Sequence, residues 1–93
     1  FDSVKESRRY RQLRLLEKSG KIKDLQLQVP FELQEKYTIN DKKVRAIKYV
    51  ADFVYIDQDG ITHVEDVKGI RTEVYKIKKK MFEYKYNIEI EEV

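Results

Sequence analysis

Residues 44–68 read VRAIKYVADFVYIDQDGITHVEDVK, and this stretch decides the fold. Val, Ile, Tyr and Phe are frequent on both sides of Asp57-Gln58-Asp59-Gly60, a combination typical of a hairpin turn. We therefore expect one strand over residues 44–56 and a second over residues 61–68, paired with each other through this turn.

Helices are expected on both sides of this hairpin. Ser3 and Glu6 have the spacing of a capping box, which predicts a helix over residues 3–18. Thr72 can cap a second helix that runs to about Tyr86. The side chains expected to face the core recur at helical spacing and are Val4, Tyr10, Leu13 and Leu16 in the first helix, and Val74, Ile77, Met81 and Tyr84 in the second.

The remaining segments predict two more strands and a loop. Apolar residues alternate over residues 22–33, which indicates a half-buried strand, and Pro30 within it favours an edge position or a bend. Residues 35–43 are polar and read as a loop, and residues 87–93 as a short closing strand. The order α-β-β-β-α-β predicts a single α+β domain over residues 1–93, with a small mixed sheet flanked by two helices.

Composition limits the classes of function. The 93 residues are 41% hydrophobic and 40% charged, which fits a globular domain and excludes an apolar membrane span. With no Cys and a single His, a bound metal would need oxygen ligands. The net charge of +3 suits a polyanionic partner such as DNA. The chain opens at Phe1 with no apolar leader, so we expect an N-terminally trimmed cytoplasmic protein.

Asp52 and Asp66 are the acids that need an explanation. Asp52 interrupts an apolar strand, where a buried charge requires either an ion pair, with Lys48 or Arg45, or a metal ion. Asp66 and Lys68 are two residues apart and share one face of the next strand, whereas Glu65 points the other way.

Two carboxylates on neighbouring strands repel each other unless a cation lies between them. Asp52 and Asp66 can be cross-strand neighbours, and oxygen ligands favour Mg²⁺ or Mn²⁺. A metal ion beside a lysine is what phosphodiester hydrolysis needs, because both offset charge that develops on the phosphate. Lys68 is suited to be this lysine, which would orient the nucleophile or stabilise the developing charge.

These residues and the order of elements resemble the PD-(D/E)XK nuclease superfamily, which includes restriction enzymes and phage junction-resolving endonucleases. The segments similar to a small phage and prophage branch of it are Phe1-Asp2-Ser3-x-x-Glu6, Leu25-x-x-Gln28-x-x-Phe31, Ala51-Asp52-Phe53, Glu65-Asp66-Val67-Lys68-Gly69 and Thr72-x-x-Tyr75-x-x-Lys78. Two positions depart from the superfamily pattern: Ala51 replaces its proline, and Asp66 replaces the commoner glutamate.

The resemblance implies a restriction-endonuclease-like fold and a Mg²⁺-dependent endodeoxyribonuclease, encoded by a phage or prophage and acting on branched or recombination intermediates such as Holliday junctions. Asp52, Asp66 and Lys68 would then be catalytic. Glu6 would add a metal ligand, although the capping box alone also explains it. Gln28 would be an active-site polar group, with a solvent-facing strand residue as the alternative.

The expected DNA contacts lie on the first helix and at the second, and they are Arg8, Arg11, Arg71, Tyr75, Lys76 and Lys79. For the basic residues, the alternative is that they form solvated helix faces. Tyr49, Tyr55 and Tyr84 are expected in packing positions, and His63 on the surface. A non-catalytic nucleic-acid-binding module and a protein-interaction domain remain open as other functions, and a thin core could recruit a second copy to form a homodimer.

Overall fold

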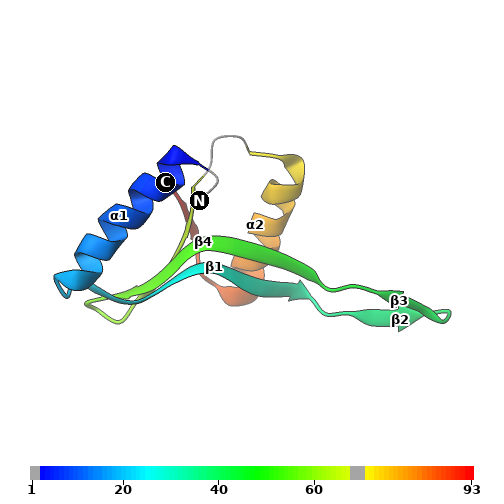
Figure 1. The fold of residues 1–93 in the computed structure, drawn as a ribbon. Helices are drawn as coiled ribbons and strands as arrows, with labels where there is room; N and C mark the ends of the chain where they lie inside the picture. The colour runs from blue at the N-terminus through cyan, green and yellow to red at the C-terminus, as the bar shows by residue number, and fades with distance from the viewer. Residues whose placement is uncertain (1–2, 68–70) are drawn as a thin grey trace.

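The computed structural model describes residues 3–67 and 71–93, which form the expected α+β fold (Figure 1). The elements in chain order are α1 (Val4–Lys18), β1 (Ile22–Gln34), β2 (Tyr37–Ile39), β3 (Lys42–Val44), β4 (Ile47–Asp57), β5 (Thr62–Asp66), α2 (Glu73–Tyr86) and β6 (Ile90–Glu92). Among the described residues, no helix has the length and apolar character needed to cross a membrane.

The main sheet has the strand order β1-β4-β5-β6 and is mixed, as expected. β4 pairs antiparallel with both β1 and β5, and β6 lies parallel to β5. Pro30 lies in β1 at the edge of the sheet, where a residue without a backbone N–H is tolerated.

The segment expected as a loop at residues 35–43 is instead a hairpin. β2 and β3 pair antiparallel, with Tyr37 opposite Val44 and Ile39 opposite Lys42. Asn40 and Asp41 at the turn have φ values of 47° and 61°. Two successive residues in the left-handed region form the tight turn that matches strand twist, so the loop prediction was wrong because this turn chemistry was read as irregular structure.

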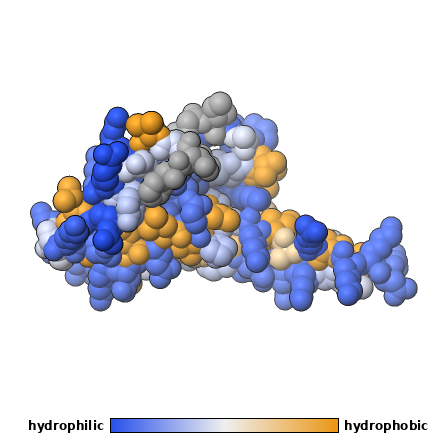
Figure 2. Space-filling model, in the orientation of Figure 1, coloured by the Kyte–Doolittle hydropathy of each residue, from blue (hydrophilic) through white to orange (hydrophobic). Residues whose placement is uncertain are grey.

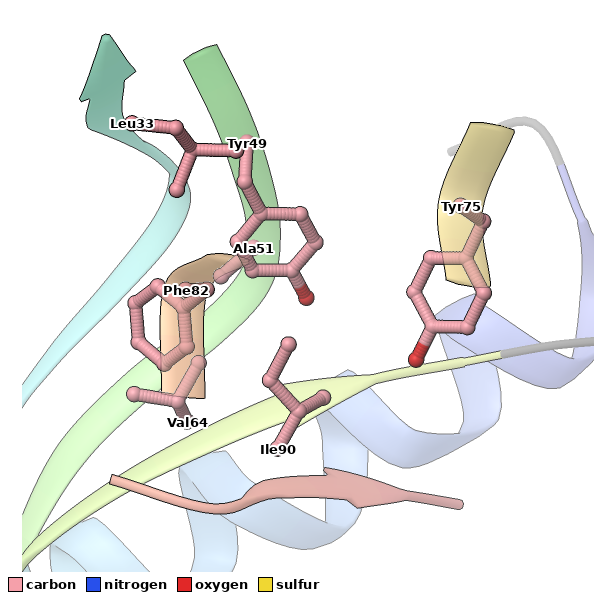
Figure 3. Close-up of a cluster of buried hydrophobic side chains, with 7 residues drawn as sticks. All are labelled: Leu33, Tyr49, Ala51, Val64, Tyr75, Phe82 and Ile90. Atoms are coloured by element: carbon pink, nitrogen blue, oxygen red, sulfur yellow. The ribbon is translucent and has the colours of Figure 1, made fainter. Parts of the chain in front are cut away.

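Two hydrophobic clusters hold the helices against the sheet. Val64 lies with Phe82 of α2 and Ile90 in one cluster (Figure 3), whereas Phe53 lies with Leu13 of α1 in the other. Along β4, Tyr49 and Ala51 belong to the α2 cluster, but Phe53 and Tyr55 belong to the α1 cluster. The buried residues 49, 51, 53 and 55 alternate without a break along β4, so they share one face of the strand, and Asp52 lies between the part covered by one cluster and the part covered by the other.

The helices bury faces that differ in part from those expected. Leu13 is buried and Tyr10 and Leu16 pack beside it, but Val4 is 70% exposed. In α2 the buried residues are Tyr75 and Phe82. Val74, Ile77 and Tyr84 are exposed, so the expected core face of this helix was wrong for these three residues. Apolar residues therefore lie along two sides of α2, and the sheet packs against the side that carries Tyr75 and Phe82.

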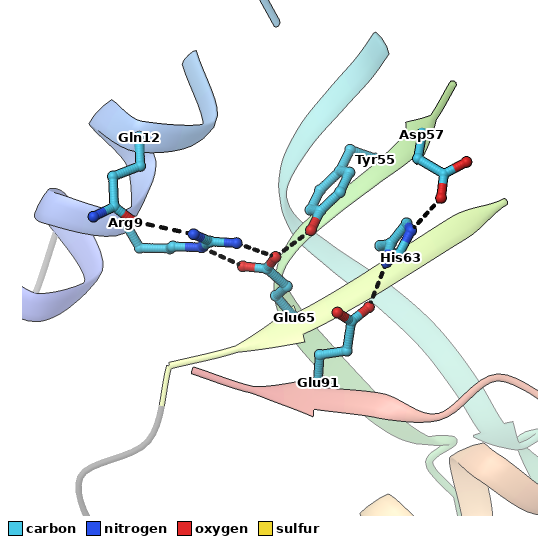
Figure 4. A network of polar contacts seen from close by, with 7 residues as sticks. All are labelled: Arg9, Gln12, Tyr55, Asp57, His63, Glu65 and Glu91. Carbon is cyan, nitrogen blue, oxygen red and sulfur yellow. Dashed lines mark hydrogen bonds and ion pairs between the residues drawn. The ribbon is translucent and has the colours of Figure 1, made fainter. Parts of the chain in front are cut away.

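A buried ion pair attaches α1 to β5 (Figure 4). Arg9 donates from Nε and Nη2 to the two carboxylate oxygens of Glu65, at 2.8 and 2.7 Å. The hydroxyl of Tyr55 donates to the same carboxylate, and Glu65 has no exposed surface. Burial, followed by this hydrogen bond to the carboxylate, raises the pKa of Tyr55.

Arg9→Ala should destabilise the domain more than most surface substitutions, because it leaves the buried carboxylate of Glu65 without its cation. Removing one partner of a buried pair costs about 3–5 kcal/mol, and the partial exposure of Arg9 favours the lower end. Urea denaturation measures the change in unfolding free energy. Arg8→Ala, on the exposed neighbour, is the control, and equal effects of the two substitutions would contradict the role of the pair.

His63 should make stability depend on pH. Its ring nitrogens lie 2.7 Å from Asp57 Oδ2 and 2.6 Å from Glu91 Oε2, and the ring stacks on Tyr55. The hydrogen bond with Asp57, and then that with Glu91, raises the pKa of His63 above 6.5.

A group whose pKa is raised by folding stabilises the folded state fully below its unfolded pKa, and this contribution is lost as pH rises through the folded value. We therefore expect the unfolding free energy to fall as pH rises above about 6.5. His63→Phe retains the stacking and removes the only imidazole, so this part of the fall should disappear. Urea denaturation between pH 6 and 8.5 compares the two proteins, and identical pH profiles would refute the assignment.

Candidate active site

Glu6 is positioned by the start of α1. Ser3, in an extended conformation before the helix, accepts a hydrogen bond from the backbone N–H of Glu6 at 3.0 Å. This is one half of the expected capping box. The carboxylate of Glu6 accepts from the side chain of Gln28 at 3.1 Å, on a strand 22 residues further along the chain. The cap fixes the backbone of Glu6, and its side chain reaches the sheet.

Gln28 joins two of the expected site residues. Its Nε2 lies 3.1 Å from Glu6 Oε2 and 3.1 Å from Asp52 Oδ1, so one amide nitrogen donates to both carboxylates. We call these three residues the carboxylate–amide cluster. The φ of Gln28 is 51°, a left-handed conformation within a strand. A residue other than glycine adopts it at a cost, and such strain is frequent at functional sites.

Asp52 links this cluster to the end of β5. It is half-buried, and its Oδ2 accepts from the backbone N–H of Val67 at 2.8 Å. β4 and β5 pair antiparallel as far as Phe53 and Glu65, and Asp52 and Asp66 are the neighbouring residues of this last pair on the two strands. The expectation that Asp52 and Asp66 are on adjacent strands is therefore confirmed.

Asp66 is buried and held by a tyrosine. Only 2% of its surface is exposed, and the hydroxyl of Tyr49 donates to its Oδ2 at 2.6 Å. Burial, and then this hydrogen bond, raises the pKa of Tyr49, so its hydroxyl stays a neutral donor. Sequence reasoning placed Tyr49 in a packing position and missed this contact.

The structure does not assemble all expected ligands around one point. Within residues 3–67 and 71–93, no three side chains of His, Asp or Glu converge closely enough to hold a metal ion. Glu6 and Asp52 share a donor, whereas Asp66 is engaged by Tyr49. Lys68, the expected catalytic cation, lies outside the described residues, and metal binding stays a prediction.

The expected DNA contacts divide into two groups. Arg8 and Arg11 are exposed on α1. At α2, Arg71 and Lys79 approach Glu92 at 2.7 and 3.6 Å, and Lys76 pairs with Glu73 at 3.1 Å. These cations lie on the surface but are engaged by acids.

Tyr75 faces the core instead of the solvent. It is 7% exposed, and its hydroxyl donates to Glu92 at 2.8 Å. Burial, and then this hydrogen bond, raises the pKa of Tyr75. Its burial speaks against a direct contact with DNA.

A basic hollow lies beside the site. It has a volume of about 290 Å³, and its lining includes Lys5, Arg8 and Val67. The same Val67 holds Asp52 through its backbone N–H, so the hollow and the carboxylate are neighbours. Lys5 was not among the expected DNA contacts, because nothing in the sequence separates it from other solvated lysines. Arg9 also lines the hollow, and three cationic side chains suit a phosphate group.

The fold and these residues define an α+β domain in which a helix N-terminus and two strands bring acids together next to a basic hollow. The chain belongs to the DUF1064 family, described as a protein of unknown function, whose model matches residues 1–91. No curated protein and no solved structure matches the chain.

Two substitutions at Gln28 should separate backbone strain from side-chain chemistry. Both Gln28→Gly and Gln28→Ala remove the bridging amide, but only glycine relieves the left-handed φ of 51°. We expect the glycine variant to be more stable than the alanine variant by about 1 kcal/mol, measured by urea denaturation. An alanine variant that is equally or more stable would show that this backbone conformation stores no strain.

Proposed function

We propose that this domain is a Mg²⁺-dependent endodeoxyribonuclease that hydrolyses phosphodiester bonds of DNA, with branched intermediates as its preferred substrates. Support comes chiefly from Asp52, a half-buried carboxylate next to Glu6. Among the described residues, the two groups that donate to Asp52 are the amide of Gln28 and the backbone N–H of Val67. Both are neutral, so they orient the carboxylate without cancelling its charge.

The donor set suits Mg²⁺. Glu6 and Asp52 offer oxygen atoms within reach of one bridging nitrogen, and Mg²⁺ prefers oxygen ligands. Asp66, on the adjacent strand, is the third carboxylate that could take part. The Gln28 amide already joins Glu6 and Asp52. When Mg²⁺ binds, this amide would have to release the two carboxylates or turn its own oxygen toward the ion.

When bound, Mg²⁺ lowers the pKa of a water molecule and offsets negative charge on the phosphate. The residues of the chain would position the ion and the substrate phosphate. Glu6 and Asp52 would hold the ion, and the Tyr49 hydroxyl orients Asp66. Lys5 and Arg8 in the basic hollow would hold a substrate phosphate beside Val67. Lys68 is assigned the role of a cation that orients the nucleophile, and the preference for branched DNA rests on the resemblance to junction-resolving endonucleases.

One observation favours a second candidate function, a non-catalytic nucleic-acid-binding module of the same fold. The amide of Gln28 satisfies Glu6 and Asp52 at once, which would be a stable end state in a protein that binds no metal. Titration calorimetry with Mg²⁺ and Mn²⁺ separates the two functions. A nuclease should bind the ion in wild-type form and lose binding in Asp52→Asn, whereas a non-catalytic module should bind neither ion.

Asp52→Asn should abolish cleavage. Supercoiled plasmid and a synthetic four-way junction are incubated with the protein in Mg²⁺ or EDTA, and products are followed on gels. We expect Asp52→Asn and Lys68→Ala each to lower the rate by more than about 100-fold, because each removes a charge that offsets the developing phosphate charge directly or through the metal.

Matched controls make this result specific. Asp59→Asn changes the same residue type in the exposed turn between β4 and β5, and Lys21→Ala removes an exposed lysine after α1. Both controls should retain wild-type activity. Equal products from wild type, Asp52→Asn and Lys68→Ala, or cleavage that persists in EDTA, would refute the proposed function.

A further inference from the structure

The hairpin formed by β2 and β3 projects beyond the rest of the fold. Figure 1 shows it extending past α2 as a two-stranded continuation of β1 and β4. Residues 37–43 are exposed and Val44 is half-buried. We call residues 35–48 the hairpin arm. Two strands alone are marginally stable in water, so packing of the core does not explain why the chain forms this arm.

The hairpin arm carries the charge excess of the whole chain. It holds five of the 20 Lys and Arg residues and two of the 17 Asp and Glu residues, which leaves 15 of each sign elsewhere. Its net charge of +3 therefore equals that of the chain. Figure 2 shows hydrophilic side chains gathered at its tip. The basic residues are all exposed and are Lys36, Lys42, Lys43, Arg45 and Lys48.

The two faces of the hairpin arm differ. Pairing of Tyr37 with Val44 and of Ile39 with Lys42 places these four side chains on one face. Thr38 and Lys43, which pair with each other, lie on the opposite face. Lysines thus point from both faces. A polyanion that surrounds the ribbon can contact both sides, whereas a flat partner would meet only one.

The reach of the hairpin arm is at most about one turn of duplex DNA. Its tip at Asp41 is eleven residues from Asp52 along the chain. At a rise of about 3.3 Å per residue the two are at most about 36 Å apart. One turn of B-DNA is about 34–36 Å long, and the major groove, about 12 Å wide, admits a two-stranded ribbon. A duplex held at Asp52 and running along the arm would therefore meet the arm within about one helical turn.

We propose that the hairpin arm lies along duplex DNA and contacts its phosphates within about one helical turn of the bond that is cut. This inference rests on the proposed function, because it takes Asp52 as the position of the scissile phosphate. The arm supplies sequence-independent affinity remote from the chemistry. Its partner is DNA, because phosphates complement the local excess of positive charge.

The first test removes two charges from the arm. In EDTA, where no cleavage occurs, fluorescence anisotropy measures the affinity of a 24-base-pair duplex for Lys42→Ala/Lys43→Ala and for the matched control Lys21→Ala/Lys23→Ala. The control makes the same change in net charge at exposed positions at the start of β1. We expect the arm variant to bind about 10-fold more weakly and its log–log salt slope to fall by about 2. The control should change affinity less than about 2-fold.

Equal losses in the two variants, or no loss in either, would overturn the proposal. Unchanged thermal unfolding confirms that both variants are folded. These results do not depend on catalysis. If DNA affinity depends on the arm but plasmid is never cut, the nuclease proposal fails and the contact stands. If plasmid is cut but the arm variant binds normally, only the arm proposal fails.

A second test identifies what touches the arm. The chain has no cysteine, so Thr38→Cys introduces a unique thiol on the face that carries Lys43. A photo-crosslinker attached there should form adducts with the duplex. Adducts between two copies of the chain, with no DNA adduct, would identify the arm as a dimer contact and overturn the proposal.

Discussion

The pair between Arg9 and Glu65 is the constraint on which the geometry of this domain depends. Glu65 is fully buried, and its carboxylate is held at both oxygens by the guanidinium of α1. Burying a carboxylate is costly unless a cation and hydrogen bonds satisfy it, so any register of α1 that moves Arg9 away from Glu65 is disfavoured. Glu6 is three residues before Arg9, nearly one turn away. The ion pair therefore also places Glu6 over β1, where it meets Gln28.

The adjacent residues Glu65 and Asp66 illustrate how a strand separates scaffold from site. Alternation directs Glu65 toward α1 and Asp66 toward the opposite face, where Tyr49 holds it. This much could be predicted from the sequence, because period-two alternation needs no tertiary information. The identity of the partners could not. Arg8, Arg9 and Arg11 are equivalent in a sequence, and only the docked helix shows that Arg9 is the one beside Glu65.

Other features were beyond sequence reasoning for related physical reasons. The second helix has two apolar stripes, and tertiary packing chose the one with Tyr75 and Phe82 over the one with Val74 and Ile77. The left-handed φ of Gln28 leaves no mark in composition, since glutamine rarely adopts it. The α+β order was recovered because long strands and capped helices carry strong local signals. The hairpin arm was missed because its turn residues are also typical of loops.

Asp52 and Glu65 show two ways in which one small domain treats a carboxylate. Glu65 is fully buried and matched by a cation, which is the arrangement expected of a residue that stabilises a fold. Asp52 is only half-buried, and its described donors are neutral amides that fix its direction. Neutral donors lower the cost of holding the charge without removing it. A half-buried carboxylate that neutral donors orient, and that shares one of these donors with a second carboxylate, is the arrangement that the proposed metal site requires.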